Sequence, residues 1–212
     1  MPRGALDNDL LFKGACYLLL AEMIAATPAV VEECGILGAA KYVVANALRT
    51  RNLNAALAYF EEHFEKFVLL EPTDQESSVA ADIELEAQRR GLQLDGGESL
   101  LFAIVELRAL AFLGTGDKRA ISAMEQIVRG RPTHDWWRGR ALCLEQILLR
   151  VLSLGDVGKI QEQVCAVAGA DKAISICFSC TARSGNVDSW RAGLESYISD
   201  LRKVAPTILA PA

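Results

Sequence analysis

The sequence predicts an α/β fold: a three-layer α/β/α sandwich with a short parallel sheet, followed by an all-α C-terminal extension. Over residues 1–130, short apolar runs alternate with helical patterns, which is typical of βαβ units and a parallel sheet. After residue 138 we find helical periodicity and no convincing strand pattern. We therefore expect two parts, an α/β domain at 1–130 and a helical extension at 131–212.

Three strands are expected in the first part. They lie at residues 4–7, 66–72 and 111–115. The second of them, "KFVLLEP", is a short β-branched and aromatic run that a proline closes, which is typical of a buried strand.

Helices are expected between and after these strands. Thr27-Pro28 ends the first helix, because proline cannot continue a helix. Thr73 or Asp74 is placed to cap a later helix, which Gly91 would end. The expected helices cover residues 10–26, 36–49, 53–67, 73–90, 98–110 and 116–128.

In the extension, helical patterns cover residues 139–154, 158–169 and 188–205. Residues 171–182 fit either a strand or a helix, and Asp171 as an N-cap favours the helix. The first of these helices is apolar most of the way round, so it needs more than one neighbour to bury it. We expect tight packing on the first part of the chain, a homodimer, or both.

The segment "HDWWRGR" lies at the boundary between the two parts. Its two tryptophans and two arginines would suit base stacking and phosphate contacts with a nucleic acid. Its position favours a different role, in which Trp136 and Trp137 pack the extension onto the α/β domain.

The composition limits the classes of protein. The net charge is −5, and so the bulk charge does not indicate nucleic-acid binding, although a local basic patch is allowed. The longest apolar stretches fall short of the about 20 residues that cross a membrane. Residues 1–9 lack the basic start and apolar core of a secretory signal. We expect a cytoplasmic protein with no membrane partner.

The chain has six cysteines, and most lie in apolar helical patterns. Buried, reduced thiols are therefore expected. Cys177 and Cys180 form a lone CxxC. Together with Cys143 and Cys165, they would supply the four thiolates of a zinc site. No second CxxC and no nearby His supports such a site.

Acidic residues follow the expected strands. Asp7 and Asp9 come after the first, Asp117 comes after the third, and Glu98 begins a helix three residues after Asp95. Each one alone is explained as a helix cap or a first-turn carboxylate. In a parallel sheet, however, ligands bind beyond the carboxyl ends of the strands, and there these carboxylates would converge on one edge.

Converging carboxylates repel one another unless a cation lies among them. Oxygen ligands suit Mg²⁺ or Mn²⁺. The nearby cations Lys13, Lys118 and Arg119 would then contact a phosphate. This combination predicts phosphodiester or phosphomonoester chemistry, in which a metal lowers the pKa of a bound water and neutralises the phosphate.

The order "ALDNDLLFKGA", "DGGESLLFAIVELRA" and "FLGTGDKRAI" resembles a PIN domain, a fold of metal-dependent ribonucleases with a parallel sheet and a cluster of acidic residues. Asp7, Glu98 and Thr115-x-Asp117 match the acidic positions of that family in order and spacing. The resemblance covers about residues 4–128.

The resemblance implies a Mg²⁺- or Mn²⁺-dependent endoribonuclease that acts on RNA. Asp7, Glu98 and Asp117 would be catalytic metal ligands, with Asp9 as a further ligand and Asp95 as an auxiliary acid. The residues that would contact the substrate are Lys13, Thr115, Lys118 and Arg119. Family members usually carry another acidic residue on a helix in the first half, for which the substitutes here are Glu32, Glu33 and Glu71.

Two other functions remain open. A PIN-like RNA-binding or protein-interaction module without catalysis would use the acids as caps and the extension as its working surface. A haloacid-dehalogenase-like phosphatase would use Asp7 as a nucleophile. Against the phosphatase, Leu11 replaces the usual small hydroxyl residue, and no second Asp follows Asp117 at short range.

Overall fold

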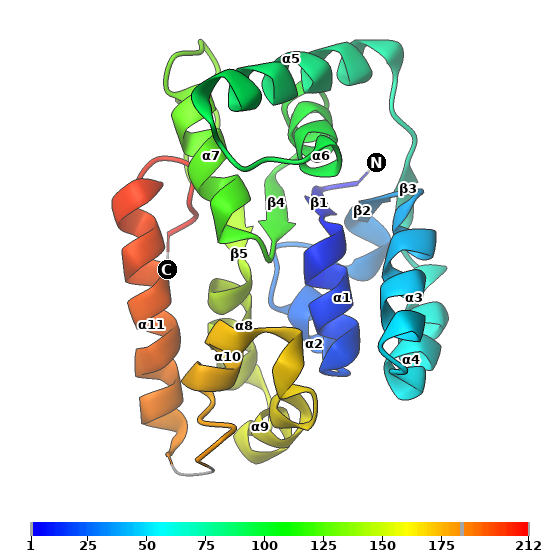
Figure 1. Cartoon of the computed structure of the whole chain (residues 1–212), viewed down its shortest axis with the longest axis vertical. Helices are drawn as coiled ribbons and strands as arrows, with labels where there is room; N and C mark the ends of the chain where they lie inside the picture. The colour runs from blue at the N-terminus through cyan, green and yellow to red at the C-terminus, as the bar shows by residue number, and fades with distance from the viewer. Residues whose placement is uncertain (1, 183–184, 212) are drawn as a thin grey trace.

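The computed structural model describes residues 2–182 and 185–211 of the chain. Its centre is a five-stranded parallel sheet in the order β3-β2-β1-β4-β5 (Figure 1). The strands are β1 Gly4–Leu6, β2 Cys34–Leu37, β3 Val68–Leu70, β4 Phe112–Thr115 and β5 Ala141–Cys143. The predicted α/β class with a short parallel sheet is confirmed.

Helices cover both faces of the sheet and make the three layers. They are α1 Asn8–Cys16, α2 Leu20–Ala25, α3 Ala40–Thr50, α4 Asn54–Phe64, α5 Asp74–Arg90, α6 Gly96–Leu107, α7 Lys118–Val128, α8 Leu144–Leu154, α9 Val157–Ala166, α10 Lys172–Cys177 and α11 Val187–Val204. Adjacent strand residues point to opposite faces. Accordingly Leu6 packs with α1 to α4 and α8, whereas Ala5 packs with α5 to α7.

The predicted helix ends with strong capping signals are confirmed. Thr73 and Glu76 form a capping box at the start of α5, and Gly91 ends that helix in the left-handed region with φ of 66°. Asp95 and Glu98 form a second capping box at the start of α6. These local hydrogen bonds explain why the sequence indicates these boundaries clearly.

The single helix predicted over residues 10–26 is wrong, because the chain forms α1 and α2 with a turn between them. Leu18 lies in that turn with φ of 53°. Tyr17, Leu19 and Leu20 are all buried. In a continuous helix, residues this close in sequence would point in different directions, and at least one of them would face the solvent. The turn lets all of them reach the core.

Two further predictions about strands need correction. Residues 36–37, expected to begin a helix, belong to β2. The β3 segment is shorter than predicted and forms the edge of the sheet, so that Leu69 is 48% exposed rather than buried.

The expectation that the chain after residue 130 is entirely helical is wrong. Strand β5 pairs in parallel with β4, with Leu113 beside Ala141 and Thr115 beside Cys143. A C-terminal segment then covers the outer edge of β5, since Ala141 N donates to Ile208 O at 2.8 Å. Residues on both sides of position 130 therefore build one sheet.

The tryptophans at the expected boundary differ in their surroundings. Trp137 is fully buried, packs against Phe102, and donates from Nε1 to Glu106 at 2.7 Å. This confirms the packing role expected for it. Trp136 lies beneath the guanidinium of Arg140, 4.3 Å from its ring centroid, so the aromatic and the basic group of this segment contact each other.

The expectation of reduced thiols is wrong for two cysteines. Cys165 on α9 and Cys180 after α10 form a disulfide with a Cα–Cα distance of 5.0 Å. Cys143 and Cys177 are free and buried. A four-thiolate zinc site is excluded in this state, because two of its four sulfurs bond to each other.

The disulfide is expected to stabilise the C-terminal part by closing a loop with a sequence separation of 15. We predict that Cys165→Ser/Cys180→Ser lowers the free energy of unfolding by about 3 kcal/mol, the loop-closure value for a loop of this length. Urea denaturation, with and without a phosphine reductant, measures the change. The reductant should destabilise the wild-type protein and leave the double variant unchanged; a wild-type protein insensitive to it would contradict the prediction.

Candidate functional site

A cleft of about 610 Å³ lies beyond the carboxyl ends of β1 and β4. Five carboxylates line it, together with apolar side chains from β2, α3 and α6. The carboxylates are those of Asp7, Asp9, Asp95, Glu98 and Asp117. The structure thus brings together every acidic residue that the sequence predicted for the metal site, because parallel strands deliver their ends to one edge of the sheet.

Asp7 is the most enclosed of these acids. It follows β1 directly, caps α1 by accepting from Leu10 N at 2.7 Å, and accepts a hydrogen bond from the Thr115 hydroxyl. Only 4% of Asp7 is exposed. Burial raises the pKa of its carboxyl to about 7, although the hydrogen bonds from Thr115 and Leu10 oppose the rise.

Thr115 and Asp117 continue from β4 into the same cleft. The Thr115 hydroxyl, besides donating to Asp7, accepts from Asp117 N at 3.0 Å, and this fixes the turn between β4 and α7. Asp117 caps α7 and is held by Arg119, whose Nη2 lies 2.6 Å from Asp117 Oδ2. Burial raises the pKa of Asp117, but the hydrogen bonds and charge of Arg119 outweigh it and lower the pKa.

Glu98 enters the cleft from the first turn of α6. Its carboxylate accepts from Asp95 N at 2.9 Å in the capping box. Burial raises the pKa of Glu98 to about 7, with smaller contributions from the charges of Asp95, Asp117 and Asp7. The carboxylates from β1, β4 and α6 are therefore close enough to repel one another.

Asp9 and Lys13 form an ion pair one turn apart on α1, with Lys13 Nζ 2.6 Å from Asp9 Oδ2. Lys13 also lies 2.7 Å from Asp171 Oδ2 and 3.3 Å from Gly116 O. A Cβ on Gly116 would lie 2.3 Å from Asp9 Oδ2, so a larger residue at this position would force the Asp9 side chain to shift. Burial lowers the pKa of Lys13, but the two carboxylates outweigh burial and raise it.

The basic residues expected to contact a phosphate are arranged differently from one another. Lys118 reaches away from the acids to Glu145 on α8, with which it forms a close ion pair. The Arg119 side chain is 71% exposed at the rim and engages Asp117. Lys13 is buried beneath Asp9.

Sequence reasoning missed two residues that touch this network. Asp171 was expected only as the N-cap of a helix, and Glu145 was given no role. Both come from the part of the chain after residue 130, and both pair with a lysine beside the acidic cleft. The only signal in the sequence was the capping position of Asp171.

The residues fit a divalent cation in their chemistry, because several carboxylate oxygens converge in one partly buried cleft. Their present hydrogen bonds do not leave them grouped around one point. Among residues 2–182 and 185–211, no set of three His, Cys, Asp or Glu side chains is gathered as around a metal. Asp9 and Asp117 would have to leave Lys13 and Arg119 to share an ion.

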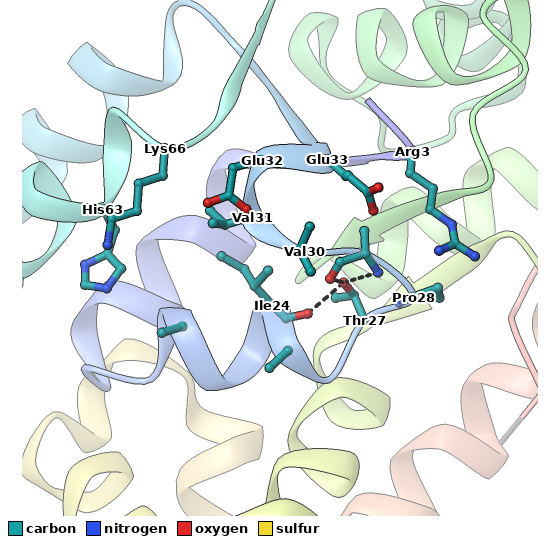
Figure 2. Close-up of a pocket in the computed structure, with 13 residues that line it drawn as sticks. Arg3, Ile24, Thr27, Pro28, Val30, Val31, Glu32, Glu33, His63 and Lys66 are labelled. Carbon is teal, nitrogen blue, oxygen red and sulfur yellow. Dashed lines mark hydrogen bonds between the residues drawn. The ribbon is translucent and has the colours of Figure 1, made fainter. Parts of the chain in front are cut away.

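The substitutes considered for a further acidic ligand lie elsewhere. Glu32 and Glu33 line a separate pocket of about 620 Å³, with Arg3, His63 and Lys66 around an apolar floor (Figure 2). Arg3 precedes β1 and Glu33 precedes β2, so this pocket lies at the opposite, amino-terminal edge of the sheet. Glu71 lines a third hollow beside β3.

Comparison with known proteins adds no family. No family model, no curated protein and no solved structure matches the chain. The function has to be argued from the site itself.

The raised pKa of Asp7 predicts how stability depends on pH. The folded state keeps the Asp7 proton up to a pH of about 7, whereas the unfolded chain releases it near 3.8. Stability contributed by this group therefore falls as the pH rises from about 4 to 7. Asp7→Asn removes this dependence, so its effect on the free energy of unfolding, relative to the wild-type protein, should be more favourable at pH 8 than at pH 4 by roughly 4 kcal/mol, at 1.36 kcal/mol per pKa unit.

Urea denaturation at the two pH values measures this difference. Asp156→Asn is the matched control, because Asp156 caps α9 in the same way at an exposed position. A gain from Asp7→Asn that is equal at pH 4 and pH 8 would show that Asp7 carries no such penalty.

Proposed function

We propose that this protein is a Mg²⁺- or Mn²⁺-dependent endoribonuclease of the PIN type, acting on RNA at the acidic cleft. One observation carries the proposal: carboxylates from β1, α6 and β4 converge in a cleft at the carboxyl edge of a parallel sheet. Two of them, Asp7 and Glu98, have their pKa raised to about 7 by burial. Structural capping alone does not require acids that are costly to ionise.

The metal would be held by Asp7, Glu98 and Asp117, with Asp9 as a further ligand. A bound divalent cation supplies a water of lowered pKa and neutralises phosphate charge. A cation among these acids would also offset the smaller part of the rise in the pKa of Glu98 that comes from the charges of Asp95, Asp117 and Asp7, burial being the larger part.

The other residues of the cleft would orient these ligands and the substrate. Thr115 fixes Asp7 through its hydroxyl, and Arg119 at the rim is placed to contact a phosphate once Asp117 is engaged. Lys13 lies behind the acids, where its charge compensates that of Asp9, whereas Lys118 pairs with Glu145 outside the cleft.

RNA is the proposed partner, and the cytoplasm the proposed location. None of the helices in the described part of the chain is long and apolar enough to cross a membrane. Disulfides are rare in reducing compartments, so the cytoplasmic proposal requires the Cys165–Cys180 bond to be one of the exceptions. A homodimer or another protein partner stays a prediction. The apolar residues of α8, on which the expectation of a dimer rested, are mostly buried within this chain.

A specific observation favours a second candidate, an RNA-binding module without catalysis. Asp9 and Asp117 are already neutralised by Lys13 and Arg119. An arrangement closed by such ion pairs needs no metal for its own stability. The phosphatase gains no comparable support, because Leu11, which replaces the usual small hydroxyl residue, is fully buried in the core.

A cleavage assay tests the proposal. Labelled single-stranded RNA should be cut in the presence of Mn²⁺ and left intact with a chelator. We expect Asp7→Asn, Glu98→Gln and Asp117→Asn each to lower the rate at least about 100-fold, since each removes a ligand and a charge. Asp156→Asn, the exposed capping control, should keep the full rate.

The same protein preparations distinguish the ribonuclease from the RNA-binding module and the phosphatase. RNA binding without cleavage, and with no Mn²⁺ uptake in calorimetry, would overturn the catalytic proposal and favour the binding module. Hydrolysis of p-nitrophenyl phosphate without cleavage of RNA would favour the phosphatase.

A further inference from the structure

The ammonium group of Lys13 joins two carboxylates from distant parts of the chain. Its Nζ lies 2.6 Å from Asp9 Oδ2 and 2.7 Å from Asp171 Oδ2, and it donates to Gly116 O at 3.3 Å. Only 7% of Lys13 is exposed. One buried cation is therefore shared between an acid of the cleft and an acid outside it.

The two carboxylates differ in what else they touch. The side chain of Asp9 is 40% exposed and lines the acidic cleft, whereas that of Asp171 is 11% exposed and lies behind Lys13. Asp171 is fixed by its other oxygen, which accepts from Ala173 N at 2.8 Å and from Ile174 N at 3.1 Å. Asp9 is free to turn into the cleft, and Asp171 is not.

The chain holds Asp171 in this place by two devices. As the N-cap of α10, it begins a helix whose Ile174 and Cys177 are buried in the same core as α1 and α8. The disulfide between Cys165 and Cys180 closes the loop that contains it. The second carboxylate thus reaches Lys13 on a tethered segment.

This sharing determines what it costs Asp9 to leave Lys13. Separating a buried ammonium from its single carboxylate leaves an uncompensated charge, which is strongly unfavourable. With Asp171 at 2.7 Å, Lys13 stays paired after Asp9 turns away. The cost to Asp9 of exchanging Lys13 for another cation is then small.

We propose that Asp171 is a positioning residue for the acidic cleft: it keeps Lys13 paired, and so releases Asp9 to bind a divalent cation. The inference deepens the proposed function and rests on it. It assigns to the part of the chain after residue 130 a direct influence on metal binding, although Asp171 itself does not line the cleft.

Calorimetric titration with Mn²⁺ tests this role without any assay of activity. Asp171→Asn removes the negative charge and keeps a side-chain oxygen that can cap α10. Asn caps helices about as well as Asp does. We expect the dissociation constant for Mn²⁺ to rise at least about tenfold, since Asp9 alone would then neutralise Lys13. Asp171→Ser, which also caps, gives a second variant should the first misfold.

Three further variants separate this mechanism from simpler ones. Asp156→Asn controls for a change at a helix cap, and Glu145→Gln controls for loss of a carboxylate paired with the other lysine of the network. Both should change the dissociation constant less than about threefold. In an Asp9→Asn background, Asp171→Asn should have no additional effect, because the residue through which it acts is gone.

Each outcome decides the question. Equal Mn²⁺ affinity in Asp171→Asn and wild type, with affinity lost in Asp117→Asn, would overturn this inference and leave the proposed function standing. A tenfold effect of Asp171→Asn that persists in the Asp9→Asn background would show that Asp171 acts through overall charge, which also overturns it. A wild-type protein that takes up no Mn²⁺ would overturn the proposed function and the inference together.

Discussion

The buried ammonium of Lys13 is the interaction on which the arrangement of the acidic cleft depends. It joins α1, the turn after β4 and the start of α10 at one point, through Asp9, Gly116 and Asp171. A cation inside the protein needs such partners, because desolvation disfavours its charge. The parallel pairing of β1 with β4 places the ends of the two strands side by side, with Asp7 and Asp117 lining one cleft, and Lys13 ties the turn after β4 to α1. The C-terminal segment is therefore part of the site's support, and the division of the chain at residue 130 does not separate site from scaffold.

The sequence revealed those parts of the fold that local chemistry determines. The capping boxes at Thr73 and Asp95, and the strand that ends at Thr115, depend on residues within a few positions of one another. Strands β2 and β5 depend on their neighbours instead. Each has three or four residues within a longer apolar run, so periodicity alone did not distinguish them from the helices that follow. The turn at Leu18 has the same origin, because it serves the burial of side chains in the tertiary structure.

In the candidate site, too, the features set by nearby residues could be predicted and those set by distant residues could not. The convergence of Asp7, Asp9, Glu98 and Asp117 could be predicted, because the carboxyl ends of parallel strands meet at one edge. The direction in which the two lysine side chains point could not be predicted. Lys13 pairs with Asp171 and Lys118 pairs with Glu145, and both partners lie far away in the sequence. The disulfide was missed for a related reason: nothing in the spacing of Cys165 and Cys180 distinguishes a bonded pair from two buried thiols.

The central claim is that the carboxylates of the cleft share a metal ion, and a crystal structure of the protein soaked in Mn²⁺ tests it most directly. The account predicts anomalous density between Asp7 and Asp117, with Asp9 turned from Lys13 towards the ion and the Lys13–Asp171 pair intact. Absence of density in the cleft, with the Asp9–Lys13 and Asp117–Arg119 pairs unchanged, would contradict it.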